Sequence, residues 1–162
     1  MLTASRLAGF FAAHAIWCVS EGDTLIPMLA YTSADGERHV ERLVGEDLGD
    51  AVAQGKERLA ANAMDATDAA LVYDGFLPLG DEKLDAIIIE MRAYFSPDSE
   101  VVIAIPYTPK SSGSFRIHHP KLLVWKNCDD FDPDDALDAF FEGVSEHEEG
   151  AKIWVECFDG AE

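Results

Sequence analysis

Three polar side chains with the chemistry of a binding site alternate along one predicted strand. Glu90, Arg92 and Tyr94 occupy alternate positions in the second half of Leu84–Phe95 (LDAIIIEMRAYF), and alternate side chains of a strand point to the same face. A carboxylate, a guanidinium and a phenol would therefore lie side by side. If this face is buried, the charges must be paired and the group is a candidate site. One face of an antiparallel sheet is commonly exposed, so we favour the interpretation that these are ordinary solvent-facing residues.

Two further tyrosines extend this group. Tyr73 and Tyr107 fall on the strands predicted before and after the central one, so these two and Tyr94 can line one concave face. Arg92 would then contact an anionic group of a ligand, because its planar guanidinium presents several hydrogen-bond donors. This is the ligand-binding site that we favour if the chain has one.

Two adjacent histidines are the other candidates. His118 and His119 can each bind a metal, or act as a base with a carboxylate such as Glu90 or Glu100. Neighbouring residues of a strand point to opposite faces, so both imidazoles serve one site only if Pro120 distorts the strand. We favour one surface histidine and one that packs against the sheet. The candidate ligand-binding residues are thus Glu90, Arg92, Tyr94, Tyr73, Tyr107, His118 and His119. We assign no catalytic residue, metal site or cofactor.

Other sequence motifs give little support for catalysis. The chain has no GxxxxGK[ST], GxGxxG, HExxH or GxSxG motif. The acidic run Asp129–Asp138 lacks the glycine of an EF-hand loop and contains Pro133, so it is interpreted as a capped helix start, with cation binding as the alternative. His14, Trp17 and Cys18 lie close in sequence, where we favour a packed junction over a nucleophilic Cys–His pair.

An antiparallel meander would position the candidate residues. Period-two patterns and turn residues predict strands at Ala69–Leu79, Leu84–Phe95, Glu100–Tyr107 and Phe115–Lys126, the last interrupted by Pro120. The flanking elements are a helix at Leu2–His14, strands at Ala15–Ser20, Thr24–Ser33 and Arg38–Val44, a helix at Glu46–Asn62, a helix from Asp132-Pro133 to before Gly150, and a strand at Ala151–Phe158. The order α-βββ-α-ββββ-α-β is an α+β fold of antiparallel hairpins with about three helices packed on the sheet, in one domain spanning 1–162.

Net charge restricts the possible partners. The formal charge is −19 at pH 7, which keeps a protein soluble and disfavours direct contact with nucleic acid or an anionic membrane. Because the acidic residues are spread along the chain, a solvated acidic surface is the first interpretation. A docking face for a basic partner and a mimic of nucleic acid are the alternatives.

Cysteine spacing and hydropathy predict the compartment. Cys18, Cys128 and Cys157 form no CxxC motif, which favours free thiols in a reducing cytoplasm. No apolar run reaches the ~20 residues that a membrane helix needs. The N-terminal apolar stretch is interrupted and no small-residue cleavage site follows it, unlike a secretory signal. We therefore expect a cytoplasmic protein without membrane contact.

Size, acidity and the mixture of hairpins and helices are similar to those of dimeric secretion chaperones, an analogy at the level of fold. The Ala-, Asp- and Gly-rich composition resembles that of small proteins of high-GC bacteria. The analogy implies a non-enzymatic binding module with a basic or amphipathic protein partner and a homodimeric state. The alternatives are a small enzyme or ligand-binding protein that uses Glu90, Arg92 and His118 or His119, and an acidic nucleic-acid mimic.

Overall fold

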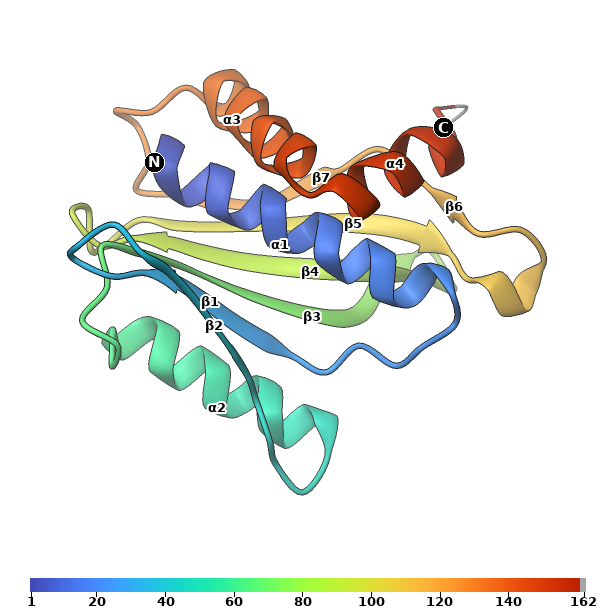
Figure 1. Cartoon of the computed structure of the whole chain (residues 1–162), viewed down its shortest axis with the longest axis horizontal. Helices are drawn as coiled ribbons and strands as arrows, with labels where there is room; N and C mark the ends of the chain where they lie inside the picture. Colours follow the sequence, from blue (N-terminus) through green and yellow to red (C-terminus); the bar gives the residue numbers. More distant parts are fainter. Residues whose placement is uncertain (161–162) are drawn as a thin grey trace.

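A seven-stranded antiparallel sheet forms the centre of the protein, with helices on both of its faces (Figure 1). The computed structural model describes residues 1–160. The strands are β1 (Met28–Thr32), β2 (Arg38–Arg42), β3 (Asp68–Leu79), β4 (Glu82–Ala93), β5 (Glu100–Thr108), β6 (Arg116–Ile117) and β7 (Lys121–Lys126). The helices are α1 (Leu2–Ser20), α2 (Leu48–Ala61), α3 (Pro133–Glu146) and α4 (Glu148–Cys157), with a 3₁₀ turn η1 (Lys110–Ser112). The strand order is β2-β1-β3-β4-β5-β6, and β7 pairs with the first half of β5, which confirms the predicted α+β fold with an antiparallel sheet.

The long β3–β4 hairpin occupies the middle of the sheet. The two strands have twelve residues each and pair along their whole length. The predicted alternation of β4 is confirmed, because Ile87, Ile89 and Met91 are all buried. Phe95, which the same pattern assigned to this face, lies beyond the end of β4 and is exposed.

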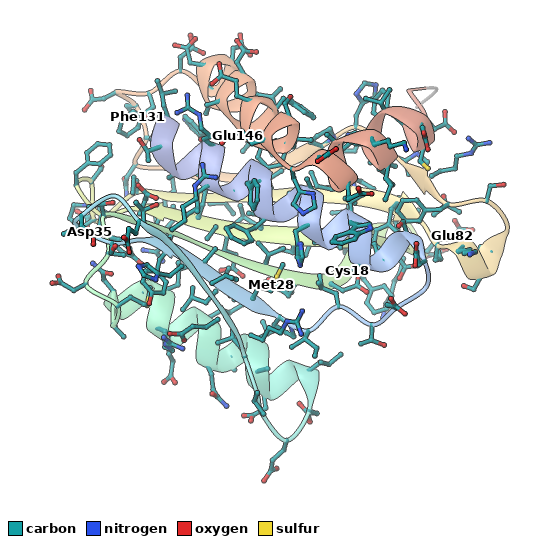
Figure 2. All side chains as sticks on the ribbon, viewed as in Figure 1. Cys18, Met28, Asp35, Glu82, Phe131 and Glu146 are labelled. Atoms are coloured by element: carbon teal, nitrogen blue, oxygen red, sulfur yellow. The ribbon has the colours of Figure 1, made fainter. Side chains whose placement is uncertain are left out.

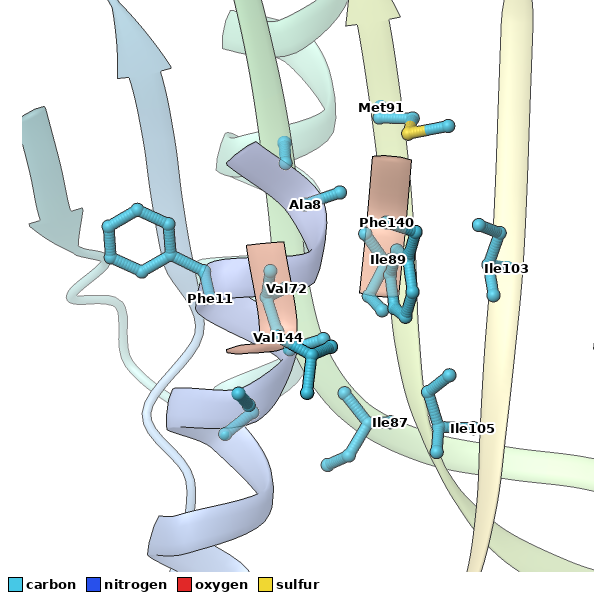
Figure 3. Close-up of a cluster of buried hydrophobic side chains, with 14 of the residues drawn as sticks. Ala8, Phe11, Val72, Ile87, Ile89, Met91, Ile103, Ile105, Phe140 and Val144 are labelled. Carbon is cyan, nitrogen blue, oxygen red and sulfur yellow. The ribbon is translucent and has the colours of Figure 1, made fainter. Parts of the chain in front are cut away.

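The main core lies between this face of the sheet, α1 and α3. Figure 3 shows the side chains that meet there, which include Ala8, Phe11, Val72, Ile89, Ile103 and Phe140. Helices α1 and α3 approach closely because Gly9 of α1 lies against the backbone of Phe140 and Gly143 of α3 lies against that of Arg6. A Cβ on Gly9 would lie 1.8 Å from the Phe140 carbonyl oxygen, so the contact requires glycine.

Helix α2 covers the opposite face of the sheet, over β1 and β3 (Figure 1). Leu59 and Ala51 of α2 pack there on Leu29 of β1 and Leu71 of β3. Within residues 1–160, the far end of this face, over β4 and β5, is covered by no helix and carries a smaller cluster around Ile88. The two faces of the sheet therefore have different environments.

The first correction concerns residues Ala15–Ser20, predicted as a strand but found as the last turns of α1. Ile16 and Val19 are buried together with Ala8 and Ala12, so burial against the sheet outweighs the β-propensity of Ile and Val. The resulting 19-residue helix could cross a membrane by length and composition alone. However, 61% of its apolar stretch is buried inside the protein, as expected for a core helix.

The second correction concerns Ala151–Phe158, predicted as a strand but found almost entirely in helix α4. Gly150 and Trp154, four residues apart, are its buried positions, which is a helical period. The alternation at Val155 misled the prediction, because that side chain is exposed. Residues 1–160 thus contain four α-helices rather than about three. Beyond α4, Phe158 pairs with the strands through an isolated parallel bridge to Ile117.

Local signals for helix and strand ends are largely confirmed. The Asp47 side chain accepts a hydrogen bond from the Asp50 N–H at the start of α2, and Asp132 caps α3 in the same way ahead of Pro133. Pro120 divides the predicted Phe115–Lys126 strand into β6 and β7, because proline cannot donate to a ladder.

Candidate functional site

The polar face of β4 looks towards α2 and forms separate hydrogen-bonded groups rather than one open site. The Tyr73 hydroxyl donates to Glu90 Oε2 at 2.6 Å, and the Lys56 ammonium of α2 lies 3.4 Å from the same oxygen. Burial, followed by the Glu90 carboxylate, raises the pKa of Tyr73 above its usual range. Tyr73 is therefore a hydrogen-bond donor at neutral pH and not a base.

Arg92 and Tyr94 are satisfied by other partners. Arg92 Nη2 donates to Glu100 Oε1 at 2.9 Å, and Lys126 Nζ lies 3.7 Å from the other Glu100 oxygen. The Tyr94 hydroxyl donates to the Leu59 carbonyl of α2, and burial raises the pKa of Tyr94 to about 12. The small hollow beside Arg92 measures about 140 Å³. This face is built from self-paired groups that tie β4 to its neighbours.

Tyr107 lies on the opposite face of the sheet from Tyr73 and Tyr94. It belongs to the core beneath α1, and its hydroxyl donates to Asp74 Oδ1 at 2.8 Å. The expected concave face lined by all three tyrosines is therefore not formed. The reason is register: alternate residues of β5 face α1, and Tyr107 shares the parity of buried Ile105.

The two histidines stand apart from the β4 group. His118 is buried, with Nε2 3.1 Å from Thr108 Oγ1, whereas His119 is exposed and its ring meets the Phe158 ring edge-on at 4.9 Å. Thr108 and Glu100 occupy opposite ends of β5, roughly 26 Å apart at 3.3 Å per strand residue. The structure thus brings neither histidine to Glu90 or Arg92, and gives the enzyme hypothesis no shared site.

The described part of the chain contains neither a cluster of metal ligands nor an activated thiol. Residues 1–160 contain no group of three or more His, Cys, Asp or Glu side chains that could hold a metal ion. The three cysteines are free. Burial raises the pKa of Cys18, Cys128 and Cys157, which keeps these groups as thiols at neutral pH.

An apolar groove lies on the α1 side of the sheet. Its first part, about 190 Å³, lies between α3 and the sheet and is lined by Met91, Ile103, Leu122 and Trp125. Its second part, about 520 Å³, lies between α3 and α4 and is lined by Phe141, Trp154, Val155 and Phe158. Pro120 and Leu137 line both parts, so the two parts adjoin, and we call them together the α3–α4 groove.

The groove exposes apolar surface beside acidic helices. Four large apolar side chains of the groove are exposed: Leu122, Leu137, Val155 and Phe158. Such a group of exposed apolar side chains on one surface is unusual. Asp134 lines the groove, and residues 129–159 contain twelve acidic residues and one Lys or Arg, Lys152. Figure 2 shows oxygen-tipped side chains projecting outward from α3. The groove is therefore apolar inside and lies in a strongly negative part of the molecule.

The groove was not predicted from the sequence, because the part of its wall that α4 supplies was expected to be a strand. The strand predicted at Ala151–Phe158 would have Trp154 and Val155 on opposite faces, whereas on helix α4 both side chains line the groove. Leu137 of α3 is exposed, although its spacing with Phe140 and Val144 predicts a shared apolar stripe. The sequence signal that could have indicated helix α4 is the four-residue spacing between Gly150 and Trp154. Comparisons with protein-family models, curated proteins and solved structures found no match, so the function is argued from this geometry.

Proposed function

We propose that this protein is a non-enzymatic binding module whose α3–α4 groove holds a basic, amphipathic segment of another protein. The observation that carries the proposal is the exposed apolar lining shared by β7, α3 and α4 in an acidic region. Grooves of this kind take up the apolar face of an amphipathic segment.

Burial of apolar surface supplies the affinity of such a complex. The exposed side chains include Val155, 82% exposed, and Leu137, 41% exposed. Covering them removes apolar area from water at about 25 cal/mol per Å². Trp125 and Trp154 lie deeper in the groove and are of the residue type that anchors interfaces.

Charge selects the partner. The net charge of −19 repels other acidic proteins, and the acids of α3 and α4 attract lysine and arginine side chains that flank an apolar face. Two of these acids already pair within the protein, because Arg6 lies 2.7 Å from Glu142 and Arg38 lies 3.6 Å from Glu146. Those pairs face α1, while Asp134 lines the groove.

The proposal retains the analogy with secretion chaperones in one respect, the holding of an amphipathic client segment. It also includes a reducing, cytoplasmic setting, which the free thiols of Cys18, Cys128 and Cys157 support. A second copy of the chain is the competing occupant, since it would form the homodimer that the analogy implies.

Fluorescence anisotropy with a labelled amphipathic peptide of leucine and lysine at helical spacing tests the groove directly. We expect binding that Leu137→Ser and Val155→Ser each weaken by about tenfold, because both remove apolar contact at the interface. The matched controls are Leu48→Ser and Val44→Ser, whose side chains are 48% and 82% exposed but lie outside the groove. These should bind like the unmodified protein.

Two further measurements vary the charge of the peptide and determine the oligomeric state of the protein. A peptide with glutamate in place of lysine should not bind, and Asp134→Asn should weaken the lysine peptide mainly by slowing association. Equal binding of both peptides, or equal effects of groove and control variants, would overturn the proposal. A dimer in sedimentation equilibrium that Val155→Ser dissociates would assign the groove to a second copy instead.

A further inference from the structure

Two histidines join α1 to the junction between α3 and α4. His14 Nδ1 lies 3.1 Å from His147 Nε2. His147 is the single residue between the two C-terminal helices, and its Nδ1 accepts a hydrogen bond from the Gly150 N–H at 2.9 Å. One imidazole therefore caps α4 and also holds it to α1.

These contacts define the protonation state of both rings. His147 Nδ1 accepts from Gly150, so the proton of a neutral His147 is on Nε2 and is donated to His14 Nδ1. Each ring is then neutral. A second proton on His147 removes the acceptor of the Gly150 bond, and a proton on His14 Nδ1 opposes the Nε2–H of His147. Either event breaks a contact at the start of α4.

The pair lies in an aromatic, partly buried setting. Trp17 meets the His147 ring with centroids 5.7 Å apart, and Phe10 meets it at 5.1 Å. The charged and titratable groups around the pair are Cys18 of α1, Asp23 after α1, Arg38 and Arg42 of β2, Glu146 of α3 and Glu149 of α4. Arg38 lies 3.6 Å from Glu146.

The stability of helix α4 depends on its packing against α1. It has ten residues, and an isolated helix of this length is marginal in water. Gly150 lies so close to α1 that a Cβ there would be 2.3 Å from the Ala13 carbonyl oxygen. Trp154 and Val155, which follow on α4, line the α3–α4 groove. Undocking of α4 would therefore remove one wall of the groove.

We propose that the His14–His147 pair is a pH-sensitive latch: the neutral pair docks α4 and completes the groove, and protonation releases α4 together with any bound segment. The effect on a bound segment rests on the function proposed above, whereas the release of α4 does not.

The local environment favours the neutral pair. Burial lowers the pKa of His14, as do the neighbouring His147 and Arg42. Burial also lowers the pKa of His147, against the opposing effects of its own backbone and Glu149. Since both pKa values lie below 6.5 in the folded protein, docking is fully stable above that pH. It weakens as the pH falls through the lowered values.

Hydrogen exchange of α4 between about pH 7.5 and pH 5 tests the latch, with rates corrected for intrinsic exchange. In the full chain we expect protection of residues 148–157 to fall as the pH drops from about 6.5 towards the lowered pKa values, by about tenfold per pH unit for each proton taken up, and then to level off, while the sheet remains protected. The double variant His14→Gln/His147→Asn should show less than about a twofold change, because asparagine still caps a helix but does not titrate. His39→Gln, which removes an imidazole outside the pair, should respond like the unmodified protein.

The labelled lysine–leucine peptide separates the two proposals. Its charge is constant over this pH range, and His119 of the groove lining is present in both proteins. Binding that weakens on acidification in the unmodified protein but not in the double variant would therefore report loss of the groove wall. Constant α4 protection in the unmodified protein, or an unchanged pH response in the double variant, would overturn the latch. If the peptide bound with an affinity that does not change with pH, the proposed function of the groove would be supported, and the proposed release of a bound segment by the latch would be wrong. An acid-labile α4 without peptide binding at any pH would overturn the proposed function alone.

Discussion

At the scale of single residues, hydrogen bonds on both faces of the sheet hold three phenols in their protonated form. Tyr73 donates to Glu90, Tyr94 to the Leu59 carbonyl and Tyr107 to Asp74. Burial raises the pKa of all three, that of Tyr94 to about 12. A tyrosine whose pKa is raised in the folded state contributes its full stabilisation below pH 10, the pKa of the unfolded state. This contribution is lost as the pH rises through the raised pKa of the folded state.

Alkaline titration should reveal these three tyrosines. We expect Tyr73, Tyr94 and Tyr107 to stay protonated in the folded protein at about pH 10.5, and to ionise together when it unfolds. Absorbance at the tyrosinate band, with and without denaturant, measures the difference. The folded protein should also lose stability above pH 10. Ionisation of all three in the folded state near pH 10 would contradict the hydrogen-bond assignments.

The Tyr73–Glu90 contact should stabilise the sheet. Tyr73→Phe removes a 2.6 Å hydrogen bond to a half-buried carboxylate, so we expect a loss of about 1 kcal/mol in the free energy of unfolding. Urea denaturation of Tyr73→Phe, Glu90→Gln and the double variant isolates the pairwise contribution. Additive single effects would show that the two groups do not interact.

Individual side chains were predicted unevenly. The sequence places Ile87, Ile89 and Met91 in the core, because alternation on a central strand depends only on the strand itself. The partners of Glu90, Arg92 and His118 could not be predicted, because they come from β3 and α2, the first residue of β5 and the last residue of β5. Such contacts depend on register and on the placement of helices, which a local pattern does not contain.

At the scale of elements, the central hairpin and capped helices were predicted well, and the two segments that pack on α1 or extend it were not. Ala15–Ser20 and Ala151–Phe158 both have short β-like patterns, but each is helical because the helix buries Ile16 or Trp154 in the core. Short apolar runs are the cases where tertiary packing decides between strand and helix. The groove was missed for the same reason.

The glycine contact between α1 and α3 makes a prediction for this pair of helices. Gly143→Ala would place a Cβ 2.0 Å from the Arg6 carbonyl oxygen, so the helices must move apart, at a cost of about 1–3 kcal/mol. Gly49→Ala on α2 is the matched control, since its Cβ would meet nothing closer than 3.4 Å. That substitution should stabilise by up to about 1 kcal/mol. Thermal unfolding of both variants measures the contrast, and equal effects would contradict the tight helix contact.

At the scale of the whole molecule, self-repulsion accompanies the net charge of −19. The acids of α3 and α4 lie close together in sequence, so part of this repulsion is local to these two helices. The same charge that attracts a basic segment therefore destabilises the empty protein.

Salt should raise the stability of the free protein. Raising the salt concentration from about 0.02 to 0.5 M shortens the screening length to a few Å, and we expect the melting temperature to rise by roughly 2–4 °C. Differential scanning calorimetry measures the shift. Salt should at the same time weaken binding of the lysine–leucine peptide, because it screens the attraction. A melting temperature that falls with salt would show that ion pairs, rather than repulsion, dominate the surface.

The packing of α3 over α1 also has a consequence during protein synthesis. Between Ser20 and Pro133 lie 112 residues, which a ribosome adds in roughly 6–22 s at 5–20 residues per second. During that interval the strands can cover one side of α1, but the side that meets Phe140 and Val144 has no partner. A helix apolar enough to cross a membrane is thus left partly uncovered on the nascent chain. Chains stalled before Pro133 should bind ribosome-associated chaperones until α3 emerges and closes the core.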